Sequence, residues 1–390
     1  MSNPLSVISR TFVAFSLCLT LTMACVHSAA ATDTKREADS LDRVPTIYVI
    51  PLKGQMGTDI HQSVIEDLIK DVNKANPDIV IYELDSADID TIYHRANDDR
   101  KEAGMVKIEE FRDILEDLHE KIDARQVMWI KDSVGISSLF ALGWEEMYMS
   151  DGARLWGLEK LSQAAGGWSD ADVKSKMLNA WVGIGSGFLQ KGGYPLELAW
   201  AMIRPEYKLS AKFKGRKVTW LNDTTGHWVV DSSDERVARF NASRAEDMAL
   251  SRGTAENLED LVFLLGYREF EPIDSGKDLH KTYTENWRRT FDRCKEWYAD
   301  YQQKLGWANG EDALKYYGGA KGDLERIVKA MRAYPAIELR WQQEMGASKI
   351  QLEIQIEQMQ EQIRGMRKNN RGGRGGRGGR GGGGGFGGAG

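Results

Sequence analysis

Apolar and polar residues follow one another along the first two thirds of the chain in patterns typical of strands and amphipathic helices. Residues 46–52 (TIYVIPL) and 79–84 (IVIYEL) are short β-branched apolar runs, and from Asp59 onward apolar residues recur at helical spacing between them. A strand, a helix and a strand within about forty residues predict a βαβ unit, with parallel strands and a right-handed crossover. Residues 106–122 show the same helical spacing and predict a second amphipathic helix.

The stretch over residues 126–161 combines an apolar strand, a Gly/Ser turn and a helix of small residues. Residues 127–130 (VMWI) predict a third strand, residues 137–143 a buried helix, and residues 147–149 a fourth strand. Further helices are expected over residues 173–191, 195–203 and 245–265, and short strands over residues 217–221 and 227–230. This alternation indicates an α/β core over residues 45–272.

The pattern after the core is wholly helical. Aromatic and apolar residues spaced by three and four from Tyr283 to Leu305 predict a helix docked on the core or on another helix, within a helical extension over residues 273–335. Apolar residues from Met345 to Met366 then fit the a and d positions of heptads, with one polar gap at Lys349. That spacing predicts a short coiled coil over residues 336–368, which we interpret as a self-association helix.

Both ends of the chain have compositions unlike the core. Arg10 precedes an apolar run and a small-residue segment, which is typical of a secretory signal peptide over residues 1–31, and residues 32–44 then form a flexible leader. The apolar run is short for a membrane span, so a retained anchor is the less favoured alternative. The residues before Cys25 loosely resemble a lipoprotein box. Residues 369–390 are rich in Gly and Arg and are expected to be disordered.

The composition limits which cofactors, partners and cellular compartments we expect for this chain. Among 390 residues there are three Cys, of which only Cys294 lies beyond the signal segment, and the His residues show no paired ligand spacing. We therefore expect no metal and no cofactor. A net charge of −6 gives no reason to expect a nucleic-acid-binding core. The signal segment predicts an exported chain, either periplasmic or secreted, so for the Arg-Gly-Gly tail (residues 371–390) an anionic surface or a plain spacer role is favoured over RNA.

Several motifs, taken in order, resemble one known superfamily. They are Gly54 after the first strand, Glu83-Leu84-Asp85 at the end of the second, the block from Glu145 to Gly152 with Gly157, the helix from Lys176 to Gly193, and the segment from Ala245 to Gly266. Their order and spacing resemble the ClpP/crotonase superfamily, and within it the Ser-Lys dyad serine peptidases of the NfeD and signal-peptide-peptidase-A types. The resemblance implies an α/β fold with a spiral core of repeated ββα units. A helical coiled-coil region and a disordered Gly/Arg tail would follow that core.

The loop after the second strand departs from the family pattern. In the family this strand runs into Thr-Pro-Gly-Gly, whose backbone amides contribute to an oxyanion hole, whereas here Ser86, Ala87, Asp88 and Ile89 follow. Glycine lets the backbone direct its N–H groups at the developing oxyanion, and the carboxylate of Asp88 would repel that charge. Loss of one such donor typically costs about 3 kcal/mol of transition-state stabilisation.

The predicted nucleophile and base depart less uniformly. The family spacing places the nucleophilic serine at Gly135, while Ser133, Ser137 and Ser138 lie close by, so a shifted turn would be needed for Ser137 to serve. Lys176 occupies the position of the family's general base, although on a helix it can also be a solvated surface charge.

These departures leave two functions open. The favoured hypothesis is a catalytically degenerate homologue that forms a homo-oligomer and binds a polypeptide or an envelope protein. The alternative is an active, divergent serine endopeptidase that uses Ser137 as nucleophile and Lys176 as base.

Overall fold

A twisted, mainly parallel sheet is the centre of the first 280 residues in the computed structural model, which describes residues 43–87, 102–159, 169–215 and 217–374. The sheet has seven strands in the order β10-β1-β2-β3-β5-β9, with β4 also paired to β3. All pairs are parallel except β5 with β9. The strands are β1 (Thr46–Lys53), β2 (Ile79–Ser86), β3 (Arg125–Val134), β4 (Met147–Met149), β5 (Arg154–Trp156), β9 (Phe240–Asn241) and β10 (Glu271–Ile273). The predicted α/β class with parallel strands is confirmed.

Helices cover both faces of this sheet because side chains alternate between its faces along each strand. On one face Tyr48, Val80 and Met128 pack with α2, α4 and α5, and on the other Ile47 and Val127 pack with α10. The core helices are α2 (Gln62–Ala75), α4 (Glu102–Lys121), α5 (Ile136–Ala141), α7 (Ala171–Lys191), α8 (Leu196–Ile203), α9 (Ala242–Asp247) and α10 (Leu258–Leu264). A separate antiparallel sheet of order β7-β6-β8 comprises β6 (Leu209–Lys214), β7 (Lys217–Leu221) and β8 (Trp228–Asp231).

The prediction of a single helix over residues 245–265 is wrong. This segment forms two helices, α9 and α10, and the chain between them runs along the edge of β4. There the amide of Arg252 donates to the carbonyl of Met147 (2.8 Å), and that of Ala255 donates to the carbonyl of Met149 (2.9 Å). Pairing of this segment with an otherwise free strand edge satisfies backbone groups that a continuous helix would leave exposed.

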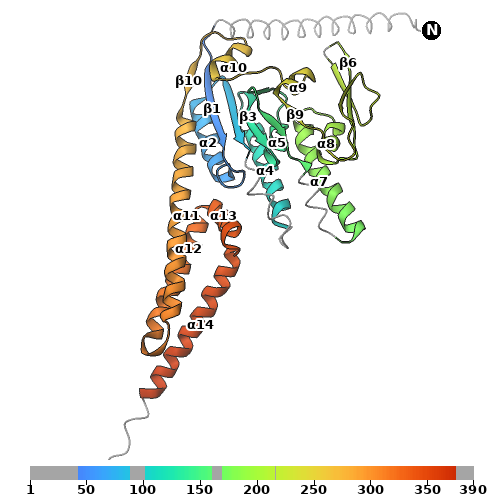
Figure 1. Cartoon of the computed structure of the whole chain (residues 1–390). Helices are drawn as coiled ribbons and strands as arrows, with labels where there is room; N and C mark the ends of the chain where they lie inside the picture. Colours follow the sequence, from blue (N-terminus) through green and yellow to red (C-terminus); the bar gives the residue numbers. More distant parts are fainter. Residues whose placement is uncertain (1–42, 88–101, 160–168, 216, 375–390) are drawn as a thin grey trace, which may run out of the picture.

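The chain after β10 forms a long helical arm that leaves the core beside β1 (Figure 1). Its helices are α11 (Ser275–Trp307), the short 3-10 turn η1 (Gly310–Asp312), α12 (Ala313–Ala333), α13 (Pro335–Met345) and α14 (Lys349–Arg374). The aromatic face predicted for the first of these helices is present, because Trp287 and Phe291 are buried in one cluster with Trp341 of α13, whose ring contacts that of Phe291.

The coiled coil predicted over residues 336–368 is not confirmed. The helix breaks at Gly346, which has a left-handed φ of 75°, and the heptad residues Leu352 and Met359 of α14 are buried in one cluster with α11 and α12. The apolar seam therefore has a partner inside the chain. α14 also continues to Arg374, so it overlaps the start of the segment expected to be disordered.

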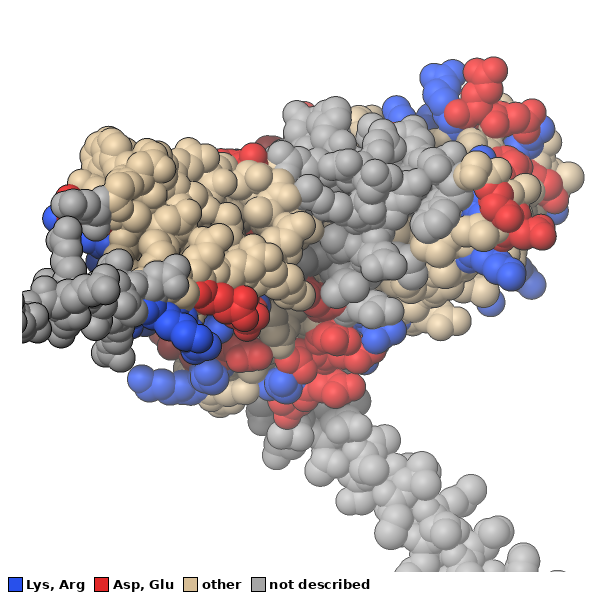
Figure 2. Space-filling model, turned by 90° about the horizontal axis from the view of Figure 1, so that it is seen from below, with Lys and Arg blue, Asp and Glu red and all other residues tan. Residues whose placement is uncertain are grey.

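Other predictions fall on parts of the chain that the structure does not describe. Residues 1–42, with the expected signal peptide and nearly all of the leader, lie outside the described residues, as do residues 375–390 of the tail. Among the described helices, none is long and apolar enough to cross a membrane. On the face drawn in Figure 2, basic and acidic side chains of the described residues lie close to one another beside a broad area without charged side chains, and they form no continuous basic area.

Candidate functional site at the turn between β3 and α5

The turn after β3 is held in a backbone conformation that requires glycine. Gly135 is the N-cap of α5 and has φ 86° and ψ −136°, a combination that side chains with a Cβ rarely adopt. Its amide donates to the carbonyl of Trp156 (2.8 Å). Gly157 lies so close that a Cβ there would stand 2.6 Å from the Gly135 nitrogen. The position to which the family spacing assigns the nucleophile is therefore a closely packed glycine.

Three serines around this turn form one buried hydrogen-bond cluster. Ser133, Ser137 and Ser138 are at most 1% exposed. The Ser137 hydroxyl donates to the carbonyl of Ser86 at the end of β2 (2.6 Å) and accepts from the Ser133 hydroxyl (3.0 Å). Ser138 donates to backbone carbonyls of Ser133 and Trp156, each at 2.9 Å. All three hydroxyls thus tie the turn to the strands on either side of it.

Lys176 lies on the exposed side of α7. Within the described part of the chain, its side chain makes no hydrogen bond or ion pair, and no hydrogen bond joins it to Ser137. The structure therefore brings Ser137 together with Ser86 and Ser133, but not with Lys176. A serine needs an adjacent base to become a nucleophile, and the groups that contact this hydroxyl are neutral oxygen atoms.

The predicted oxyanion region is described only in part. Asp88 and Ile89 lie outside the described residues, whereas Ser86 and Ala87 are within them. The pairing of β2 with β3 shifts register between Leu84 and Asp85, which places Ser86 opposite Ser133. This shift brings the carbonyl of Ser86 within reach of the serine cluster.

A charged pair that the sequence reasoning missed supports the same turn. Asp132 accepts hydrogen bonds from the Ser133 amide (3.1 Å) and from the amide (3.1 Å) and guanidinium Nε (2.9 Å) of Arg154. The hydrogen bond to Asp132 raises the pKa of the Arg154 guanidinium. Asp132 and Arg154 stand on β3 and β5, and the signal available in the sequence was a carboxylate directly before the serines.

The arm reaches the same end of the sheet through the loop after β1. Asp59 in this loop is 3% exposed, and both of its carboxylate oxygens accept from Nη2 of Arg288 on α11 (3.0 and 2.9 Å). Gln55 contacts Arg340 (3.3 Å) and Gln343 (3.4 Å) of α13. These contacts join residues more than two hundred positions apart, and no local pattern in the sequence predicts them.

The loop and the turn are linked through β2. The amide of Gly54 donates to the carbonyl of Asp85 (2.9 Å), and the next residue is Ser86, which holds the Ser137 hydroxyl. His280 of α11 is buried near Asp59, and this burial lowers the pKa of its imidazole, while the Asp59 charge partly offsets the effect.

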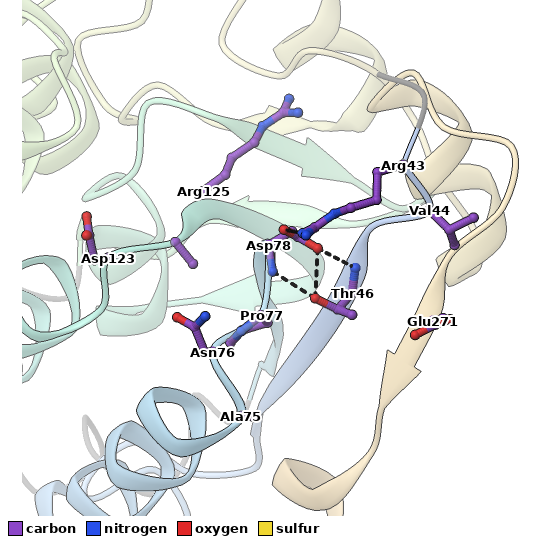
Figure 3. A pocket seen from close by; sticks show the side chains of 11 residues that line it. Arg43, Val44, Thr46, Ala75, Asn76, Pro77, Asp78, Asp123, Arg125 and Glu271 are labelled. Atoms are coloured by element: carbon purple, nitrogen blue, oxygen red, sulfur yellow. Dashed lines mark hydrogen bonds and ion pairs between the residues drawn. The ribbon is translucent and has the colours of Figure 1, made fainter. Parts of the chain in front are cut away.

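A pocket lies at the opposite, amino-terminal ends of β1, β2 and β3 (Figure 3). It has a volume of about 780 Å³ and is lined mainly by polar and charged side chains. The Asp78 carboxylate accepts from the amide and the hydroxyl of Thr46 (both 2.8 Å) and pairs with Arg43. The Thr46 hydroxyl in turn accepts from the Asp78 amide (3.0 Å). These groups fasten the starts of two strands, and the pocket is separate from the serine cluster, which lies beyond the carboxyl ends of the strands.

No metal centre is evident in the described ranges. Among these residues, no group of three or more His, Cys, Asp or Glu side chains converges as metal ligands. Cys294 is buried, and burial raises the pKa of its thiol to about 12. A thiol held protonated is a poor ligand and a poor nucleophile.

Comparison with known proteins gives a distant likeness. No family model and no curated protein matches the chain. Among solved structures, a lysine mutant of the 1510-N membrane-bound stomatin-specific protease with a bound substrate peptide is 13% identical over 56% of this chain and 78% of its own, with a TM-score of 0.34. A serine mutant of that protease is 12% identical over 57% of this chain and 85% of its own, with a TM-score of 0.34. A third structure, the 1510-N membrane protease specific for a stomatin homolog from Pyrococcus horikoshii, is 16% identical over 38% of this chain and 72% of its own, with a TM-score of 0.21. Similarities this low say nothing about the chemistry of this chain.

Proposed function

We propose that this chain is an exported, catalytically degenerate relative of the ClpP/crotonase-fold serine peptidases, which acts as an oligomeric polypeptide-binding or scaffold protein. The observation that carries the proposal is the hydrogen bond from the Ser137 hydroxyl to the Ser86 carbonyl. The Ser137 hydroxyl donates its hydrogen bond to a backbone carbonyl. No base among the described residues contacts this hydroxyl to accept its proton.

Two further observations support the loss of peptidase chemistry. Gly135 replaces the serine expected from the family spacing, and its left-handed backbone disfavours any residue with a Cβ. Lys176 is exposed on α7, and within the described residues no hydrogen bond joins it to the Ser137 hydroxyl, although a serine nucleophile needs an adjacent base.

A fluorophosphonate probe tests the proposal directly, because it labels only serines that a base has activated. We expect no labelling of the full chain under conditions that label a known serine peptidase. Ser137→Ala and Lys176→Ala are compared with Ser175→Ala, which changes an exposed serine beside Lys176 on α7. Labelling of the parent chain that disappears in either of the first two variants but persists in Ser175→Ala would establish the peptidase instead.

Polypeptide binding is tested separately from catalysis. A permanently unfolded probe, reduced and carboxymethylated α-lactalbumin carrying a fluorophore, is titrated with the full chain. We expect saturable binding that is unchanged in Lys176→Ala. Absence of binding at all accessible concentrations would leave only the scaffold role.

Assembly would use residues that the arm leaves exposed. Ile350 and Ile354 stand one turn apart on α14 and are 63% and 48% exposed, while the heptad seam of the same helix is buried. We expect Ile350→Gln with Ile354→Gln to shift the sedimentation of the full chain toward the monomer. An unchanged sedimentation coefficient would remove this surface from the assembly.

Export rests on residues 1–31, and the expected mature chain begins near residue 32. The chain is expressed with residues 1–31 included, and mass spectrometry of the recovered protein measures the residue at which the mature chain begins. A retained first segment would favour the anchored alternative, and a lipid on Cys25 would show as an added mass.

A further inference from the structure

The β7-β6-β8 sheet lies on the opposite side of the core from the arm (Figure 1). β6 and β7 form a hairpin whose last pair is Lys214 with Lys217, preceded by Phe213 with Val218 and Lys212 with Thr219. Because side chains alternate along a strand, the three lysines share one face of the hairpin, while Phe213 and Val218 lie on the other.

The three hairpin lysines (Lys212, Lys214 and Lys217) are exposed and without a salt-bridge partner. Within the described residues none of them forms a hydrogen bond or an ion pair, whereas Lys208 of the same region pairs with Asp234 (3.4 Å). The carboxylate of nearby Asp223 is directed at Thr225, accepting from its amide (2.8 Å) and its hydroxyl (2.7 Å). Thr225 is also the main cause of the lowered pKa of Asp223, with Lys212 contributing less. The hairpin end thus presents a local excess of positive charge.

Two large apolar side chains on the neighbouring strand adjoin this charge. Trp228 and Val229 of β8 are 55% and 51% exposed. The rings of Trp228 and Phe213 pack edge to face, with their centroids 6.3 Å apart. Val229 lies opposite Ser210, on the face that carries Lys212. An exposed tryptophan beside unpaired lysines is the composition of segments that lie at the headgroup level of a bilayer.

We propose that the end of the β6–β7 hairpin, with Trp228 and Val229 beside it, docks onto a lipid surface that carries anionic headgroups. A protein partner requires a complementary patch of about 800 Å² on each side, centred on buried apolar anchors. Here two apolar side chains point to opposite faces of an edge strand among flexible cations. A layer of headgroups needs no shape complementarity and accepts both faces when the hairpin enters end-on.

Sedimentation with vesicles tests this inference. The full chain is mixed with vesicles of phosphatidylcholine and phosphatidylglycerol in a two-to-one ratio, and binding to phosphatidylcholine alone is subtracted to remove the contribution of the apolar signal segment (residues 1–31). One lysine near such a surface is worth about fivefold in affinity, so Lys212→Gln, Lys214→Gln and Lys217→Gln together should weaken binding about a hundredfold. High salt should weaken binding of the parent chain in the same direction.

Matched variants isolate the hairpin from total charge and from the tail. Lys174→Gln, Lys281→Gln and Lys329→Gln remove the same charge from exposed positions on α7, α11 and α12, and should change affinity by less than about threefold. The comparison is repeated with the tail arginines at positions 371, 374, 377 and 380 changed to Gln in both variants. Trp228→Ser should weaken binding with all lysines present. Circular dichroism verifies that each variant is folded.

Three outcomes would overturn the inference. The hairpin and control variants could lose equal affinity, which would mean that net charge alone acts. Binding could depend only on the tail arginines. The hairpin variant could lose affinity for poly-glutamate but not for vesicles, which would identify the surface as a site for acidic polypeptides.

Discussion

The hydroxyl of Ser137 and the backbone carbonyl of Ser86 are joined by a hydrogen bond of 2.6 Å between buried atoms. The two residues belong to α5 and to the end of β2, and the sequence separates them by fifty-one positions. A serine in this setting closes the gap between a strand and the neighbouring helix. Its hydroxyl is part of the packing of the turn, which is why we assign it a structural role.

Ser137→Ala should lower the stability of the core. The change removes the donor to the Ser86 carbonyl and the acceptor for Ser133, and a buried group left without its partner costs about 1–3 kcal/mol. Urea unfolding followed by tryptophan fluorescence measures the loss. Ser175→Ala, on the exposed side of α7, should change the unfolding free energy by less than about 0.5 kcal/mol. Equal effects of the two changes would contradict the structural role of Ser137.

Gly135→Ala should destabilise the turn. Its φ of 86° and ψ of −136° belong to a region that residues with a Cβ occupy at a cost of about 1–3 kcal/mol. Gly187→Ala provides the opposite sign, since this exposed helical position on α7 has no atom within 4 Å of the added Cβ. Alanine there should raise the unfolding free energy by about 0.5–1 kcal/mol. Thermal unfolding of both variants measures the difference, and a stabilising Gly135→Ala would contradict the turn geometry.

The sequence was informative where structure is local. The strands at residues 46–53 and 79–86 and the helices around them follow from apolar spacing, and the strand-to-helix turn at Gly135 was placed by its small residues. The prediction of one helix over residues 245–265 is wrong because part of this segment pairs with the edge of β4, and local propensity carries no information about such pairing. The heptads of α14 were recognised, but apolar spacing does not tell whether the partner helix belongs to another copy or to the same chain.

The candidate site was predictable by position but not by contacts. The place of Ser137 beside the turn predicts it as a site residue, while its hydrogen-bond acceptor depends on the register shift between β2 and β3. The pairing of Asp59 with Arg288 joins residues more than two hundred positions apart, and neither has a local pattern that names the other. A single sequence carries no signal for such contacts.

Arg288→Met should loosen the arm from the core. The Asp59 side chain is 4% exposed and would lose its cationic partner, whereas Arg288 is 58% exposed, so water screens the pair in part. We expect a loss of about 2 kcal/mol, below the 3–5 kcal/mol of fully buried pairs. Hydrogen exchange should quicken in residues 54–61 and 275–292. Arg289→Met, its exposed neighbour, is the control, and equal exchange in the two variants would show that the pair does not hold the arm.

The arm should also loosen in acid through His280. Burial lowers the pKa of this imidazole, and Lys53 and Arg288 act in the same direction, although the charge and backbone of Asp59 oppose them. The folded chain therefore keeps His280 neutral at a pH where the unfolded chain, with a pKa near 6.5, already binds a proton. The stability that His280 contributes is complete above about pH 6.5 and is lost as the pH falls toward the lowered folded pKa.

His280→Gln should flatten this pH dependence, because the variant has no imidazole to protonate. The slope attributable to one histidine is at most about 1.4 kcal/mol per pH unit, and urea unfolding between about pH 7 and 5 measures it. His119 is a half-buried histidine whose pKa is also lowered by burial, so His119→Gln should remove its own share of the slope. Exchange in residues 275–292 distinguishes the two, since only protonation of His280 acts at the joint between arm and core. If His280→Gln retained the full slope and the same acid-quickened exchange at the joint, His280 would not be the group that responds to pH.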